Sequence, residues 1–371
     1  MKRTVILLLA LLPTASFLTV CLMPTASAAD KTADGYYADV WNKIDGETKK
    51  LMESIGITQS AESLSDMTPE RVISSAFSLF SDSAADVLPS FCAVLAVMLA
   101  VSLLMSFGIK TEGVRQTAEC AGFACIMFTV LSVSGGLTEA VTGAVNLTED
   151  FMLGIVPTFA GVIAMSGSPT LALSFNSAVL AFAQGISGTF SSLLPSYASV
   201  ITSVAAAGVI NPYFACEKLT SLLNKLTCGA MTFICGIFTA VLSVKGIIAG
   251  AADTVTVKGL RFLIGSSVPV VGSAIGDALN SVIASLGLIR HSVAAVALTA
   301  VVLIALPALV KIAVYKISLS LLSVLSDILS LNKISGFIDS VNGIFSLYAA
   351  VLCFNAFVFT VSTAIVLTLS K

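Results

Sequence analysis

Long apolar runs recur along most of this sequence, and they constrain the fold more than any other feature. Several runs approach or exceed the roughly 20 residues that an α-helix needs to cross the hydrocarbon core of a bilayer. Only 11% of the 371 residues are charged, whereas soluble domains carry about 25%. So few charges cannot cover a water-facing surface. The sequence therefore predicts an all-α, polytopic integral membrane protein.

Composition excludes several classes of function. A net charge of −2 argues against nucleic-acid binding, which requires clustered lysine and arginine. His291 is the only histidine, so a multi-histidine metal site is excluded. The eight cysteines lie in or beside apolar runs and include no CxxC pair, which favours buried, inert thiols. P-loop and HExxH motifs are absent from the sequence. We therefore expect no cofactor.

Residues 1–28 have the pattern of a secretory signal peptide. A basic start, Lys2-Arg3, precedes an apolar core and an Ala26-Ser27-Ala28 cleavage site. We expect cleavage after Ala28, and an uncleaved membrane anchor is the alternative. The signal would deliver the polar residues 29–86 to the extracytoplasmic side as a helical segment. That segment is expected either to lie on the membrane as a cap or to dock a partner.

Two helices are expected within this extracytoplasmic segment. Tyr36–Ile55 has helical periodicity, with Trp41 and Ile44 on its apolar face. Thr68-Pro69 predicts the start of a second helix, since proline is tolerated in the first turn.

Residues 87–371 are predicted to form the transmembrane domain, with about 7–8 transmembrane helices. Lysine and arginine are more frequent on the side expected to be cytoplasmic, where Lys311 and Lys316 end one span. Ser318–Asp339 is expected to be an amphipathic helix on the same side. A tight hairpin is expected at Gly167-Ser168-Pro169. The loop Thr138–Asp150, with three acidic residues and no lysine or arginine, is expected on the outer side. The expected crossings are Leu88–Phe107, Ala118–Leu137, Phe151–Ser166, Leu171–Phe190, Ser192–Ile210, Thr227–Gly250, Val293–Tyr315 and Ile344–Leu369.

The stretch Asp253–Asn280 is interrupted every few residues by glycine, serine, proline or a charge. Irregular backbone survives at membrane depth only where protein or water satisfies it. We therefore predict that Lys258–Leu288 is a broken, re-entrant-like segment, sheltered by other helices as the core of the protein. Its candidate functional or packing residues are Lys258, Gly259, Arg261, Pro269, Gly272, Gly276, Asp277 and Asn280.

Three interpretations of the charges in this stretch remain open. Lys258 and Arg261 are three residues apart and so share a helix face. They are expected to bind lipid phosphates, to pair with Asp253 or Asp277, or to line a polar path. Gly272 and Gly276 have the GxxxG spacing of close helix packing, within this chain or against another subunit.

Two further motifs suggest activities of other classes. Phe151–Pro157 and Phe262–Pro269 are similar, Gly/Pro-interrupted segments, and matching broken segments are typical of transporters. Gly185-Ile186-Ser187-Gly188 fits the GxSG pattern of intramembrane serine proteases, for which only His291 is available as a base. Glycine and serine are so frequent here that a chance match is easy, and we do not expect an enzyme.

The residues Asp253-Thr254-Val255-Thr256-Val257-Lys258-Gly259, followed by Phe262 and Val268-Pro269-Val270-Val271-Gly272, resemble the stage III sporulation protein AE (SpoIIIAE) family. The order of signal peptide, polar segment and many spans is similar as well. The resemblance implies a multi-pass subunit in the mother-cell membrane around the forespore. This subunit would belong to a channel or secretion-like complex with other SpoIIIA-type membrane proteins and a SpoIIQ-type forespore protein. A permease-like transporter of a small molecule is the alternative.

Overall fold

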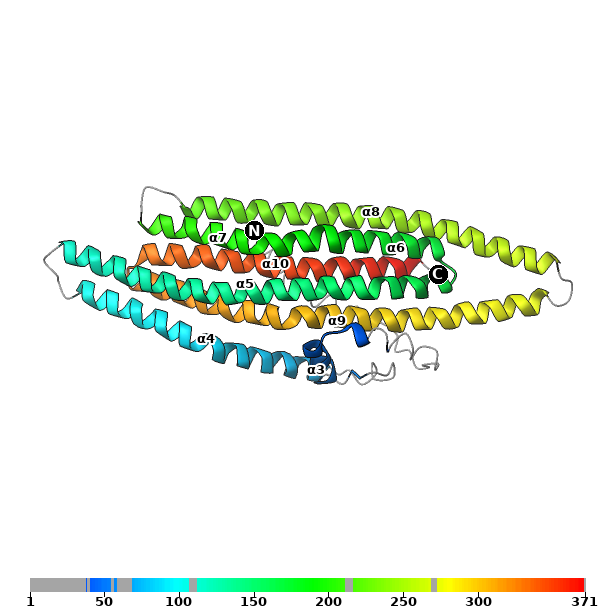
Figure 1. The fold of residues 1–371 in the computed structure, drawn as a ribbon, viewed down its shortest axis with the longest axis horizontal. Coiled ribbons are helices and arrows are strands. Elements are labelled where there is room, and N and C mark those ends of the chain that lie inside the picture. Colours follow the sequence, from blue (N-terminus) through cyan, green and yellow to red (C-terminus); the bar gives the residue numbers. More distant parts are fainter. Residues whose placement is uncertain are drawn as a thin grey trace.

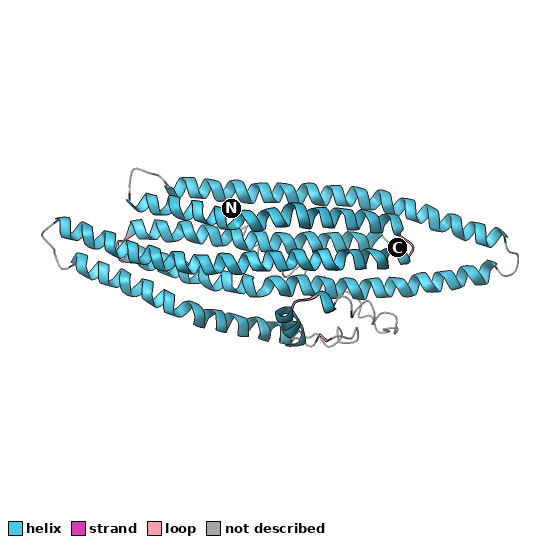
Figure 2. Ribbon diagram, in the orientation of Figure 1, coloured by secondary structure: helices cyan, strands magenta, loops and turns pink. Residues whose placement is uncertain are grey.

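The computed structural model of the chain describes residues 38, 41–54, 57–58, 69–106, 112–210, 216–267 and 272–369. Within these ranges all regular structure is helical (Figure 2), which confirms the predicted all-α fold. The long helices lie side by side along one axis in an elongated bundle (Figure 1). Six helical stretches among the described residues are long and apolar enough to cross a membrane. The chain is therefore a polytopic membrane protein.

Most of the helices are longer than the predicted spans. In chain order the elements are α3 (Gly46–Ser54), α4 (Pro69–Ser106), α5 (Glu112–Met165), α6 (Pro169–Phe182), the π-helical turn η2 (Ala183–Ser187), α7 (Gly188–Ile210), α8 (Cys216–Ser267), α9 (Gly272–Ile328) and α10 (Asn332–Leu369).

Helix α5 joins two spans that were predicted to be separate crossings. Its 54 residues include the whole of 138–150, which was expected to be a polar loop. The hydroxyl groups of Thr138 and Thr148 donate to the carbonyl oxygens of Ser134 and Ala144, each four residues earlier. Such bonds satisfy polar side chains within a helix, so the polar composition of 138–150 does not interrupt α5.

Two other predicted boundaries are also wrong. No turn separates Leu171–Phe190 from Ser192–Ile210, because α6, η2 and α7 follow one another directly with Pro195 inside α7. Helix α9 continues beyond Lys311 and Lys316 as far as Ile328, so these lysines lie inside a helix and not at its cytoplasmic end.

Ser318–Asp339 is not one amphipathic helix. The end of α9 and the start of α10 meet there in a turn, at which Ser330 takes a left-handed φ of 61°. The N–H of Leu331 donates to the carbonyl oxygen of Ser326 at 2.9 Å, the bond that typically closes a helix end.

The predicted α5–α6 hairpin is confirmed. Helix α5 ends at Met165 and α6 begins at Pro169. Gly167 has a φ of 92°, a conformation that glycine adopts without steric cost. The N–H of Ser168 donates to the carbonyl oxygen of Ile163 at 3.3 Å. The helix start predicted at Thr68-Pro69 agrees with α4, whose first residue is Pro69.

The centre of the bundle is the hairpin of α9 and α10. The apolar windows of these two helices are 67% buried, against 22% to 33% for the others. Two buried clusters succeed each other along the axis. One combines α4 with 123–145 of α5, α7, 308–322 of α9 and most of α10. The other combines the α3 region with 151–163 of α5, α6 and 293–304 of α9. We call these parts of the bundle the α4 half and the α3 half.

The α3 region covers one side of the α3 half. The carboxylate of Asp45 accepts the N–H groups of Glu47 and Thr48 at 3.0 Å each. This cap starts a new helix, so the helix predicted over Tyr36–Ile55 is interrupted at Asp45. Trp41 and Ile44 are buried, as their place on the apolar face predicted.

Candidate functional site

The stretch Asp253–Asn280 lies at one tip of the bundle and not at its centre. Helix α8 continues unbroken to Ser267, and α9 begins at Gly272. Figure 1 shows both helices extending past the α5–α6 turn. The two helix ends fall within the predicted broken segment, as expected for two helices that meet and reverse direction.

Beyond Asp253, the predicted shelter is absent at the side chains of this stretch that the structure describes. Val255 is 72% exposed, and Lys258 and Gly259 are also exposed. The reason is geometric, because this end of α8 extends beyond the first residues of α6. Arg261, Gly272, Gly276, Asp277 and Asn280 lie on α8 and α9, but their side chains are outside the described part of the structure, as is Pro269. The roles expected of Lys258 and Arg261, which are lipid binding, pairing with Asp253 or Asp277, or lining a polar path, stay predictions.

Asp253 is a buried residue of this stretch, and it bonds to another helix. Its side chain is only 3% exposed. Its two carboxylate oxygens accept the N–H groups of Thr170 at 3.0 Å and Leu171 at 2.9 Å. Ser168, at the N-cap position of α6, makes no side-chain cap bond of its own. A carboxylate on α8 therefore caps α6 and offsets the positive end of its dipole.

Arg290 on α9 contacts the same α5–α6 turn. It is 5% exposed, and its Nη1 donates to the Ser166 hydroxyl at 3.3 Å. Burial lowers the pKa of Arg290 from its ordinary value. Asp253 and Arg290 thus fasten α8 and α9 to the α5–α6 turn, which indicates a structural role for both.

The geometry argues against the serine-protease interpretation. Gly185–Gly188 forms the η2–α7 junction, at the end of α6 opposite Pro169. His291 follows Arg290, which contacts the turn at the start of α6. The 14 residues of α6 therefore separate the serine from the histidine by about 20 Å. Proton transfer requires hydrogen-bond distance.

The two similar Gly/Pro-interrupted segments, Phe151–Pro157 and Phe262–Pro269, do not form a structural repeat. Phe151–Pro157 lies inside the continuous helix α5, with Pro157 tolerated within it, whereas Phe262 is near the end of α8. The first of the two predicted breaks is therefore wrong.

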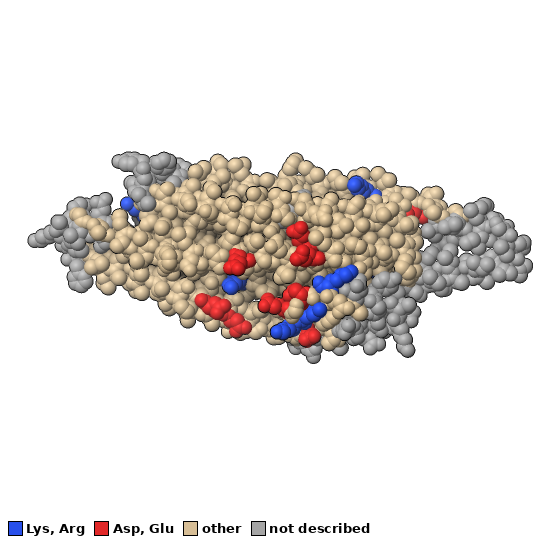
Figure 3. Space-filling view, viewed as in Figure 1, with Lys and Arg blue, Asp and Glu red and all other residues tan. Residues whose placement is uncertain are grey.

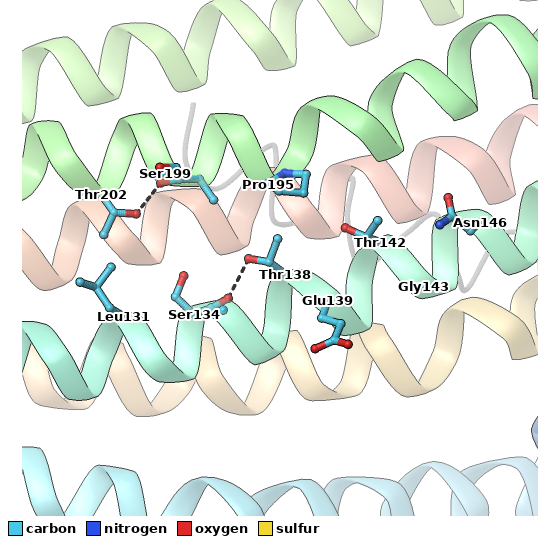
Figure 4. Close-up of a pocket in the computed structure, with 12 residues that line it drawn as sticks. Leu131, Ser134, Thr138, Glu139, Thr142, Gly143, Asn146, Pro195, Ser199 and Thr202 are labelled. Atoms are coloured by element: carbon cyan, nitrogen blue, oxygen red, sulfur yellow. Dashed lines mark hydrogen bonds between the residues drawn. The ribbon is translucent and has the colours of Figure 1, made fainter.

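An open groove between α5 and α7, mainly apolar at its surface, is the candidate functional site that the sequence did not reveal (Figure 4). Its volume is about 670 Å³. Helix α5 contributes Leu131, Ser134, Gly135, Thr138, Glu139, Thr142, Gly143 and Asn146, and α7 contributes Pro195, Ala198, Ser199 and Thr202.

Helical spacing places these groups on one face. Ser134, Thr138, Thr142 and Asn146 are four residues apart, so they form a row along α5. The sequence interpretation divided this row, because it placed Ser134 in a span and the other three residues in a loop. Its four-residue spacing is the signal by which it is recognisable.

Several polar groups in the walls of the groove are bonded within the protein. Thr138 shares a hydrogen bond of 2.6 Å with the hydroxyl of Tyr348 on α10, and Thr202 donates to the Ala198 carbonyl. Ser191 donates to the amide oxygen of Asn146, which joins α7 to α5. Small residues keep the space free, since a Cβ on Gly135 or Gly143 would meet nothing within 4 Å.

Most polar groups of the groove are buried in its walls. Ser134, Thr138 and Thr202 are buried, whereas Glu139, Asn146 and Ser199 are exposed. The exposed groups can form hydrogen bonds with a neighbouring helix.

Comparisons with known proteins identify the family. The family described as "Stage III sporulation protein AE" matches residues 53–370. "Stage III sporulation protein AE" of Bacillus subtilis (strain 168) is 23% identical over 236 residues, an alignment that covers 62% of this chain and 58% of that relative. The chain thus spans less than two thirds of the length of the curated relative it matches. No solved structure matches. From the extent of the family match we conclude that this chain belongs to the stage III sporulation protein AE family.

Proposed function

We propose that the chain is a non-enzymatic membrane subunit of a sporulation-specific channel or secretion-like complex between mother cell and forespore, required for endospore development. Family membership supports the sporulation role. The groove supports the proposed membership in a complex. Small residues at a helix surface allow another backbone to approach closely, so an open groove lined by glycines and by a few exposed polar side chains favours a protein partner as its occupant.

The family resemblance suggests the partners and the place. The chain would lie in the mother-cell membrane around the forespore, with its N-terminal segment extracytoplasmic. It would assemble there with other SpoIIIA-type membrane proteins and meet a SpoIIQ-type forespore protein. The exposed charges of α3, which include Glu47, Lys50 and Glu53, support an aqueous location for that segment.

A permease-like transporter of a small molecule is the second candidate. The groove volume of about 670 Å³ lies within the range of roughly 300–1,000 Å³ that is typical of small-ligand sites. The predicted matching breaks no longer support this candidate, since the segment at Phe151 is unbroken.

Two adjacent glycines of α5 test the proposal. Gly135 lines the groove and Gly136 does not, although both are exposed and a Cβ on either meets nothing within 4 Å. Gly135→Leu should fill the groove and lower heat-resistant spore titre by about tenfold or more, because a bulky residue blocks close approach of a partner. Gly136→Leu has the same effect on helix propensity and should sporulate like the unchanged chain.

Co-purification separates the two candidates. In sporulating cells with the variant as the only copy, a complex subunit with Gly135→Leu should lose the other SpoIIIA-type proteins from its affinity-purified membranes. A permease should keep them while sporulation fails. Equal spore titres for Gly135→Leu and Gly136→Leu would show that the groove has no role.

A further inference from the structure

Most of the described surface that is visible in Figure 3 is uncharged, and the two buried clusters of the bundle are apolar. Asn355 of α10 is an exception, because its side chain is polar and only 1% exposed. Neither its amide oxygen nor its amide nitrogen has a hydrogen-bond partner in the part of the chain that the structure describes. A leucine, with a similar branched shape, would avoid the cost of burying an unpaired amide. Asn355 therefore destabilises the observed fold.

The position of Asn355 along the bundle follows from a nearby bond. Tyr348, seven residues earlier and on the same face of α10, bonds to Thr138 of α5. Helices α5 and α10 run in the same direction (Figure 1), so Asn355 lies near the level of Asn146, two turns beyond Thr138. Thr142, in the wall of the groove between these levels, also has a buried hydroxyl without a partner among the described residues.

The turn η2 lies at the same level as Asn355. Phe354, the residue before Asn355, packs against Phe182 and Phe190, with ring centroids 5.5 and 6.0 Å away. Phe182 directly precedes η2 and Phe190 closely follows it. The ring of Phe354 therefore contacts the chain on both sides of η2.

The η2 turn interrupts the regular hydrogen bonds between α6 and α7. The N–H of Gly188 donates to the carbonyl oxygen of Ala183, five residues earlier, so the turn holds one residue more than an α-helical turn. Such π-helical turns are rare and occur frequently at functional sites. Pro195 causes a second interruption, because it has no N–H to donate to the carbonyl of Ser191. Residues 188–194 therefore lie between two interruptions of one continuous helical path.

This short segment is bonded to the end of the groove. Ser191 donates to the amide oxygen of Asn146 on α5, and the α7 wall of the groove begins at Pro195. Space for movement exists beside η2, since a Cβ on Gly185 would meet nothing within 4 Å. A shift of residues 188–194 would break the bond between Ser191 and Asn146 and widen the groove at this end.

We propose that η2 and residues 188–194 move as one unit between two positions, and that the buried amide of Asn355 finds hydrogen-bond partners only in the second. The movement opens and closes the groove at Asn146. The amide destabilises the observed position and stabilises the other, which keeps both populated. This switch goes beyond the proposed function, because it depends on the groove and not on the identity of its occupant.

Asn355→Leu tests the energetic part of the proposal. Leucine buries no polar atom, so the purified variant in detergent should unfold at a temperature about 2–4 °C higher than the unchanged chain. Thr363→Val is the matched control on the same helix. The Thr363 hydroxyl is fully buried but donates to the Phe359 carbonyl at 2.9 Å, so its loss should not raise the unfolding temperature. A lower unfolding temperature for Asn355→Leu would overturn the proposal.

A distance measurement tests the movement itself. Spin labels are attached to Gly136→Cys on α5 and Leu193→Cys on α7, in a full-length chain whose other cysteines are replaced by alanine. Both positions are exposed and lie outside the groove lining. Double electron–electron resonance in lipid nanodiscs should show two distance populations, and Asn355→Leu should lose one of them. A single population without the substitution, or two unchanged populations with it, would overturn the proposal. Loss of one population with normal spore titre would support the switch and contradict the proposed role of the groove.

Discussion

Replacing Asp253 with alanine is expected to destabilise the bundle by about 2–4 kcal/mol, since hydrogen bonds to a charged group contribute about 1.5–3 kcal/mol each. The variant loses both bonds to Thr170 and Leu171 and leaves their N–H groups without the carboxylate. It also removes the negative charge from the α6 N-terminus, where it is favourable. Thermal unfolding of the purified protein in detergent measures the loss.

Asp253→Asn is the matched control. Its amide oxygen keeps one acceptor at nearly the same volume, so it should restore part of the lost stability. An alanine variant as stable as the unchanged chain would show that the contact between α8 and α6 contributes nothing to the fold.

Replacing Gly122 with leucine should also cause a large loss of stability. A Cβ at this position would overlap Cγ2 of Val101 on α4. Valine is β-branched and stiff at χ1, so the two helices must separate. Overpacking of this kind costs about 1–3 kcal/mol and occasionally more. We expect the variant to lose the α4–α5 contact and to be degraded in cells.

Gly136→Leu on the same helix provides the comparison for Gly122→Leu. Open space surrounds Gly136, and leucine has a better helix propensity than glycine by up to about 1 kcal/mol. The Gly136 variant should therefore be at least as stable as the unchanged chain. Equal stability of the two leucine variants would contradict the observed packing of α4 on α5.

Local backbone chemistry made the turns predictable from sequence. Gly167-Ser168-Pro169 combines a residue that tolerates positive φ with one that starts helices, and the structure has a hairpin there. Pro69 begins α4 for the same reason. These signals depend on a few adjacent residues, so no knowledge of the rest of the fold is required.

Helix continuity was not predictable in the same way. A hydropathy window detects apolar composition, and it cannot distinguish one helix of 54 residues from two spans and a loop. The charges at Glu139, Glu149 and Asp150 suggested a loop, although they belong to a continuous α5. Lys311 and Lys316 suggested a cytoplasmic helix end, although α9 continues past both.

The broken segment was wrongly predicted to lie at the centre of the fold, because the environment of its residues depends on residues that are distant in sequence. The sequence suggested that Asp253 acts together with Lys258 and Arg261, its neighbours in sequence. In the fold it bonds to Thr170, 83 residues away. The groove was missed for a related reason, since it combines a row on α5 with a row on α7.

Electron cryomicroscopy of the full chain in a lipid nanodisc tests the fold most directly, because one map shows both the continuity of α5 and the packing of α8 against α6. We predict unbroken helical density for α5 from Glu112 to Met165, with the Asp253 carboxylate against the N–H groups of Thr170 and Leu171. Density in which α5 is interrupted within 138–150, or in which Asp253 is turned away from α6, would contradict the fold.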